Sequence, residues 1–152
     1  MTFDNQYIQQ RIEKANQLRA IGIDPYANNS SRNTTIEKYH NVNSDLVQKE
    51  DKRDEHRHYT VAGRIKLFRL MGKASFLKIE DESGMLQIYV ARDNLPENFY
   101  NDVFKKLIEV GDIIEVSGYP FITQQGELSL HANVLTLLTK AISPLPEKFH
   151  GL

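Results

Sequence analysis

The chain has 152 residues, of which 40% are hydrophobic and 26% are charged, and its formal net charge is −1 at pH 7. A chain of this size can bury one sizeable core, so we expect a single domain with appendages. Cysteine is absent, which excludes disulfide frameworks and thiolate metal sites. The nearly neutral net charge argues against a general, sequence-blind nucleic-acid binder.

No export or membrane signal is visible in the sequence. The first 14 residues are polar and carry charges of both signs, unlike a secretory signal peptide. No apolar run approaches the roughly 20 residues of a membrane-spanning helix. We therefore expect a cytoplasmic protein.

Residues 1–58 are predicted to form an N-terminal helical extension. Apolar side chains spaced by three or four predict an amphipathic helix over residues 4–21, with Gly22 near its C-cap. A second helix is expected to begin at Thr34, which has capping-box spacing to Glu37. The residues expected to face inward from the first helix are Ile8, Ile12, Ala15 and Leu18.

Residues 59–140 contain the alternation of apolar and polar side chains that is typical of β-strands. In the first strand we expect Val61, Ile65 and Leu67 to share the core face. The turn after the second strand contains Gly84, where we expect a positive φ. The five predicted strands are Tyr59–Phe68, Ala74–Asp81, Met85–Ala91, Ile113–Phe121 and Glu127–Leu138.

A helix is predicted between the third and fourth strands, from Leu95 to about Leu107. The order β-β-β-α-β-β is the layout of an OB-fold, a five-stranded barrel that we expect to be antiparallel and mainly β. The face of its second and third strands commonly binds oligonucleotides. Residues 141–152 contain two prolines and no periodicity, and we expect them to be a linker toward a further domain that these residues lack.

The predicted binding face is basic and carries an aromatic side chain. Between Tyr59 and Ile79 there are five basic residues and no acidic one. Phe76 falls on the polar side of its strand, opposite to Leu77 and Ile79. Cations for phosphates and a ring for base stacking are what single-stranded nucleic-acid binding requires.

Three outward side chains are candidate base contacts. Phe76 would stack on a base and Gln87 would cover its other side, whereas the alternatives are packing of Phe76 under the second helix and an ordinary polar surface role for Gln87. Glu127 follows a turn and could accept the N3–H of uracil, although a lone glutamate there is more often a turn-flanking charge. Candidate contacts to phosphates or base edges are Arg64, Lys66, Arg69, Lys73 and Lys78.

Catalytic and metal-binding signatures are missing from the sequence. Phosphate-binding, dinucleotide-binding and nucleophile-elbow motifs do not occur. His56 and His58 are interpreted as solvated residues rather than metal ligands, because no cysteine accompanies them. The adjacent Asp81 and Glu82 are better explained by turn chemistry than by acid–base catalysis.

Three blocks resemble the N-terminal region of class II lysyl-tRNA synthetases over nearly the whole chain. They are VAGRIKLFRLMGKASFLKIEDESGMLQIYVARDNLP, VGDIIEVSGYPFITQQGELSL and LLTKAISPLPEKFHGL. The resemblance implies an OB-fold domain that binds the U-rich anticodon of lysine tRNA. It assigns Phe76 and Gln87 to a sandwich around the central uracil and Glu127 to reading that base, with Arg64 and Arg69 as further contact candidates.

The resemblance also implies a parent enzyme, a homodimer that ligates lysine to tRNA using ATP and Mg²⁺ bound in a downstream domain. We expect no cofactor and no catalytic residue in this chain itself. The alternatives are a general single-stranded nucleic-acid-binding OB protein and a barrel retained for protein interaction. Glu127 argues against the first, because an acidic group in a basic site costs affinity unless it selects a base.

Overall fold

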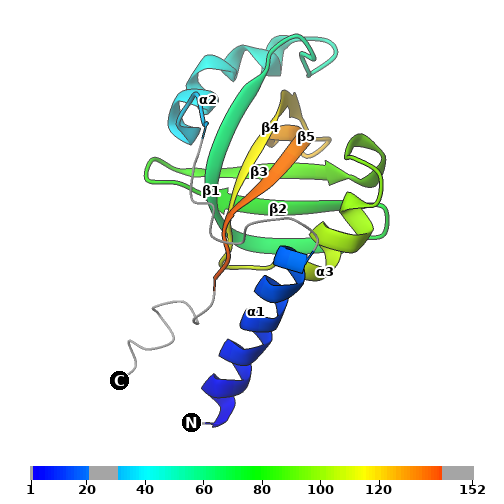
Figure 1. The fold of residues 1–152 in the computed structure, drawn as a ribbon. Helices are drawn as coiled ribbons and strands as arrows, with labels where there is room; N and C mark the ends of the chain where they lie inside the picture. Colours follow the sequence, from blue (N-terminus) through cyan, green and yellow to red (C-terminus); the bar gives the residue numbers. More distant parts are fainter. Residues whose placement is uncertain (1, 21–30, 142–152) are drawn as a thin grey trace.

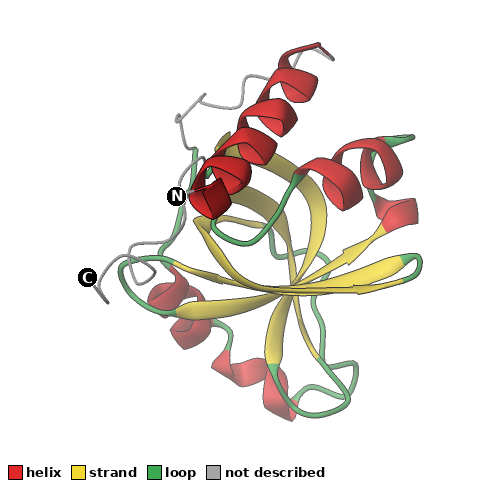
Figure 2. Cartoon of the chain, turned by 90° about the horizontal axis from the view of Figure 1, so that it is seen from below, coloured by secondary structure: helices red, strands yellow, loops and turns green. Residues whose placement is uncertain are grey.

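A computed structural model of the chain describes residues 2–20 and 31–141. The expected C-cap at Gly22 and the expected linker at 142–152 lie outside the described residues. Figure 1 shows a sheet whose strands cross steeply, and Figure 2 shows the same chain from below with the helices around its outside.

Five strands form a closed barrel in the order β1-β2-β3-β5-β4. Neighbouring strands are antiparallel, except that Gln87–Tyr89 of β3 run parallel to Ser129–His131 of β5. The five predicted strands are confirmed, but the expectation of a wholly antiparallel barrel is wrong at this pairing. The strands are β1 (Tyr59–Met71), β2 (Ala74–Glu80), β3 (Met85–Ala91), β4 (Ile113–Ile122) and β5 (Leu128–Thr139).

A β-bulge in β1 changes which of its side chains face outward. The register of β1 against β2 shifts between Ile65 and Leu67. A bulge inserts one extra residue, so side chains beyond it exchange faces. Leu67 is therefore 42% exposed rather than in the core as predicted. Phe68 turns inward instead and stacks on Phe104, with ring centroids 4.9 Å apart.

The connection between β3 and β4 is helical but not one continuous α-helix. It contains the 3₁₀ turn η2 (Arg92–Asn94), the π-helical turn η3 (Tyr100–Phe104) and the short α3 (Lys105–Leu107). The predicted helix start at Leu95 is wrong because residues 95–98 form bends and a turn, with a positive φ of 67° at Asn98 that a helix does not allow. Tyr100 is buried after this turn, where its hydroxyl lies 2.6 Å from Ser75 Oγ and donates to the Gly72 carbonyl.

The N-terminal helix α1 (Thr2–Ala20) lies beside α3 at one end of the barrel (Figure 1). Ala15 and Leu18 are buried as predicted, but Ile12 is 38% exposed. Arg11 takes a buried position on this helix instead, because its guanidinium donates to the Ala141 carbonyl at 2.9 Å. The inward face of α1 is thus partly ionic.

The second helix, α2 (Ile36–Val42), is capped by Thr35 rather than Thr34, because the amide of Lys38 donates to Thr35 Oγ1 at 3.2 Å. A 3₁₀ turn, η1 (Ser44–Gln48), follows it. Asp81 holds the start of α2 onto the β2–β3 turn by accepting from the amide of Ile36.

Asp81 also organises the β2–β3 turn itself. Its carboxylate accepts from the amides of Ser83 and Gly84 and from the Ser83 hydroxyl at 2.7–3.0 Å. The turn role predicted for Asp81 is confirmed. The positive φ expected at Gly84 is wrong, since a positive φ among the described glycines occurs at Gly72, Gly111 and Gly126.

A buried ionic cluster lies where β5 ends near α1 and α3. The Lys140 ammonium donates to the Leu107 carbonyl and to carboxylate oxygens of Glu109 and Asp112, at 2.7–2.8 Å. Burial raises the pKa of Asp112 even though Lys140 favours its carboxylate. For Glu109, burial is outweighed by the hydrogen bond and attraction from Lys140, so its pKa is lowered.

Candidate nucleic-acid interface

A groove of about 490 Å³ lies on the outer face of the barrel. It is formed by the second half of β1, by β2 and β3, and by the turn that connects β4 to β5. Residues far apart in the sequence therefore meet in it. The groove is lined by Leu67, Arg69, Met71, Phe76, Lys78, Gln87, Thr123, Gln125 and Glu127.

Phe76 supplies the aromatic surface of the groove. It pairs with Arg69 of β1 on one side and with Tyr89 of β3 on the other, and the Phe76 and Tyr89 rings are 5.1 Å apart at 54°. The helix α2 contacts the other end of β3, where His40 Nε2 lies 2.9 Å from the Met85 carbonyl oxygen. Phe76 thus packs beside Tyr89, and the alternative of packing under the second helix is wrong.

Gln87 lies next to Lys78 in the sheet, two pairs along from the Phe76–Tyr89 pair and therefore on the same face. Its side-chain amide donates to Ser129 Oγ at 3.1 Å, and Ser129 Oγ donates to the Glu127 carbonyl at 3.3 Å. This chain of hydrogen bonds fixes the plane of the Gln87 amide. A fixed planar group beside the Phe76 ring can cover a second face of a flat ligand.

Glu127 is held at the rim of the groove by the turn that precedes β5. Its amide donates to Thr123 Oγ1 at 3.1 Å, its carbonyl accepts from the Thr123 amide at 3.0 Å, and Gly126 provides the positive φ of 90° that this turn needs. The Glu127 carboxylate lies 3.5 Å from Lys78 Nζ. The groove therefore presents a positioned acceptor next to a donor.

The predicted basic residues divide into two groups. Arg69 and Lys78 line the groove. Arg64 lies in a different hollow with Glu80 and donates to the Gly111 carbonyl at 2.9 Å. Lys73 lies in the β1–β2 turn, where its carbonyl accepts from the Arg92 amide. Lys66 forms an ion pair with Glu80 and does not line the groove. The structure thus brings two of the five basic candidates into the groove and leaves Arg64, Lys66 and Lys73 outside it.

Sequence reasoning missed four lining residues. Leu67 was assigned to the core, and Met71 lies in the part of β1 beyond its predicted end. Thr123 and Gln125 belong to the turn next to Glu127, and their proximity to that residue in the sequence was a signal that could have found them.

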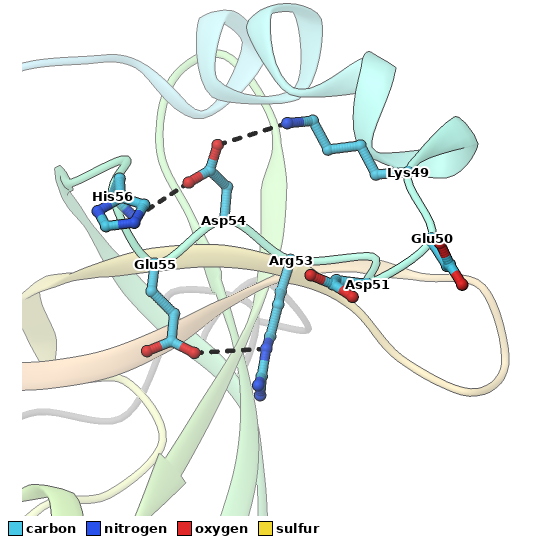
Figure 3. A pocket seen from close by; sticks show the side chains of 7 residues that line it. All are labelled: Lys49, Glu50, Asp51, Arg53, Asp54, Glu55 and His56. Carbon is cyan, nitrogen blue, oxygen red and sulfur yellow. Dashed lines mark hydrogen bonds and ion pairs between the residues drawn. The ribbon is translucent and has the colours of Figure 1, made fainter.

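A larger hollow of about 670 Å³ lies over the charged loop 49–56 (Figure 3). Both of its basic side chains are paired with carboxylates: Lys49 with Asp54 at 3.7 Å and Arg53 with Glu55 at 3.4 Å. Glu50 and Asp51 also line the hollow, so its net charge is negative, which disfavours an RNA backbone. The amide of His56 donates to Asp54, and this hydrogen bond lowers the pKa of that carboxyl. Its lining residues include the His56 imidazole but no Phe, Tyr or Trp, whereas the groove is lined by the larger Phe76 ring.

The described part of the chain has neither a metal-binding cluster nor a membrane-spanning helix. Within residues 2–20 and 31–141, no group of three or more His, Cys, Asp or Glu side chains is arranged to hold a metal ion. None of the helices described there has the length and apolar character needed to cross a bilayer. The groove on the barrel is the candidate site.

The fold and the groove define a class of protein. Residues 59–138 match the family model described as an OB-fold nucleic acid binding domain, tRNA anti-codon. The match covers more than half of the chain, and the chain belongs to this family.

Individual relatives extend the likeness to the helical extension. The chain is 81% identical over 99% of its length to a lysine–tRNA ligase of Aliarcobacter butzleri. It is 54% identical over its whole length to that of Wolinella succinogenes, and 53% identical over 99% to that of Helicobacter pylori strain G27. In each case the chain spans 30% of the length of the relative.

Proposed function

We propose that this chain is the anticodon-binding module of a lysine–tRNA ligase and that it recognises the U-rich anticodon of lysine tRNA. One observation carries the proposal: the groove brings Phe76, Gln87 and Glu127 together from three separate parts of the barrel. The relatives are named lysine–tRNA ligases and are 81% and 54% identical to the chain, which supports lysine as the amino acid.

In this proposal the central base of the anticodon enters between the Phe76 ring and the Gln87 amide. Stacking of a base on an aromatic side chain generally contributes about 1–3 kcal/mol and tolerates any base. Stacking therefore supplies affinity, and another group must supply selectivity. Arg69, which pairs with Phe76 in the sheet, is placed to contact a neighbouring phosphate.

Glu127 is proposed as the group that selects uracil. A carboxylate only accepts hydrogen bonds, and uracil presents an N3–H donor. Cytosine presents a lone pair at the same atom, which the carboxylate would repel. The turn fixes the Glu127 backbone at the rim of the groove, and the ion pair with Lys78 holds its carboxylate over the groove.

For the whole protein, we propose an ATP- and Mg²⁺-dependent enzyme that joins lysine to its tRNA, in a cytoplasmic homodimer. Its catalytic residues would lie in the part of the relatives that this chain does not span. This module would contribute tRNA selection. Lys73 and Arg64 lie outside the groove. We propose that they contact the RNA backbone on either side of the anticodon.

The test is a titration of the chain with the anticodon stem-loop of lysine tRNA and with the same stem-loop carrying cytosine at the central position. The uracil version is expected to bind more tightly, and Glu127→Gln is expected to reduce that preference. Glu97→Gln, a change of an exposed glutamate outside the groove, is the matched control. Equal binding of both stem-loops would favour a general single-stranded nucleic-acid binder, and binding of neither would refute the proposal for the isolated module.

A further inference from the structure

Lys78 lies in the centre of the groove rather than at its edge. In the sheet it pairs with Leu67 on one side and Gln87 on the other, and all three line the groove. Its ammonium lies 3.5 Å from the Glu127 carboxylate, and the two side chains are 39% and 44% exposed. A ligand that reaches Glu127 therefore also reaches Lys78.

We propose that Lys78 reads the central base together with Glu127, as the donor half of a donor–acceptor pair, and does not serve as a phosphate contact. This inference rests on the proposed function. The ammonium can only donate hydrogen bonds and the carboxylate can only accept them. Uracil presents the complementary pair, because its N3–H lies next to a carbonyl oxygen.

The same pair opposes cytosine twice when the base binds in the same orientation. The N3 lone pair of cytosine faces the carboxylate of Glu127, and its exocyclic amino group faces the ammonium of Lys78. One residue alone would oppose only one of these groups. The pair thus gives a stronger discrimination between the two pyrimidines than Glu127 can give by itself.

The ion pair also makes Lys78 a poor phosphate ligand. Its positive charge is compensated by Glu127, so the two side chains together add little to the field that attracts the RNA backbone. Arg69 lies two pairs along the sheet, opposite Phe76, and is the better placed cation for that task. The groove therefore separates backbone contact from base reading.

Thio-substituted stem-loops test the assignment. Sulfur accepts hydrogen bonds less well than oxygen, so replacing O4 of the central uridine, the atom that the cytosine amino group replaces, by sulfur weakens this acceptor and keeps N3–H. For the unchanged protein we expect the 4-thio loop to bind roughly 3- to 10-fold more weakly than the uridine loop, the effect of one hydrogen bond. In Lys78→Met this difference is expected to disappear, and the preference for uracil over cytosine to shrink.

Lys66→Met is the matched control. Lys66 forms an ion pair with Glu80 at the same 3.5 Å separation but does not line the groove. This variant is expected to keep both the thio effect and the base preference. Thermal melts of both variants establish that they are folded.

Two outcomes would overturn the inference. Lys78→Met could weaken the binding of all loops equally and reduce the slope of log K against log salt concentration by about one. In that case Lys78 contacts a phosphate. If Lys78→Met leaves the thio effect unchanged, another donor reads the carbonyl. Failure of the proposed function looks different, since the unchanged protein would then show no preference for uracil over cytosine.

Discussion

Two of the lysine–carboxylate pairs of the barrel differ mainly in their surroundings. Lys140 and Asp112 lie 2.7 Å apart with both side chains 0% exposed, whereas Lys78 and Glu127 lie 3.5 Å apart and are 39% and 44% exposed. The buried pair can exchange its partner only if the barrel opens. The exposed pair can exchange its partner for a ligand, so we propose that the same chemistry serves the fold in one place and recognition in the other.

The largest effect on stability is expected for Lys140→Met. The substitution leaves Asp112 buried and without its ammonium partner, and removing one member of a buried ion pair costs about 3–5 kcal/mol. We expect a loss of that size in the free energy of unfolding, measured by urea denaturation. The second variant, Lys140→Met with Asp112→Asn, is expected to recover part of the loss. A single variant as stable as the original chain would show that the pair contributes nothing to the fold.

The next largest effect is expected for Asp81→Asn. The Asp81 side chain is 3% exposed and accepts hydrogen bonds from both α2 and the β2–β3 turn. Loss of these charge-assisted bonds is expected to cost about 1.5–3 kcal/mol of unfolding free energy.

The pH dependence of stability tests the same residue. Burial alone would raise the pKa of Asp81, but hydrogen bonds from Ser83, Ile36 and Gly84 outweigh burial and lower it below the ordinary value of 3.8. A lowered pKa gives stability that is present above the ordinary value and is lost as pH falls through the lower, folded-state value. The stability gap between the original chain and Asp81→Asn is therefore expected to narrow below about pH 4. A gap that stays constant would remove Asp81 as its source.

Phe76→Ala is expected to act on binding more than on folding. Loss of a stacking surface should weaken anticodon stem-loop binding by about 1–3 kcal/mol. Loss of the contact with Tyr89 should cost about 0.5–1.5 kcal/mol of stability beyond the buried area. Phe76→Leu keeps an apolar side chain without the aromatic face and separates the two effects. Unchanged binding in both variants would exclude Phe76 from the site.

The smallest effect on stability is expected for Lys78→Met. Lys78→Met removes an exposed ion pair, and such pairs contribute about 0–1 kcal/mol. We expect a change in unfolding free energy within that range, the same as for Lys66→Met, measured in parallel urea titrations. A loss near that of Lys140→Met would mean that the groove pair is structural.

The order and type of the strands could be predicted from the sequence because alternation reports burial directly. Leu77 and Ile79 face the core as their spacing indicates. The errors arise where tertiary contacts override the local pattern. Leu67 and Phe68 are both apolar, so the bulge that exchanges them leaves no mark in the alternation.

The candidate site was predictable in part for a related reason. Phe76 and Gln87 belong to neighbouring strands with a regular register, so their proximity follows from alternation and a short hairpin. Arg64 was grouped with the site because it is basic and lies on β1, but it precedes the bulge and lies in a separate hollow. The burial of Lys140 depends on how the β3–β4 connection returns to β5, which local periodicity does not encode.

The parallel pairing of β3 with β5 has a consequence for how the molecule is made. Gln87 and Ser129, which are hydrogen-bonded across this pairing, are 42 residues apart in the sequence. Pairings between distant segments form slowly because the intervening chain must first be closed into a loop. The first three strands can associate as local hairpins while the rest of the chain is still being synthesised. Glu127 enters the groove only when β5 docks. The base selection that we propose for Glu127 therefore depends on a long-range pairing, whereas the Phe76–Tyr89 surface needs only the local β2–β3 hairpin.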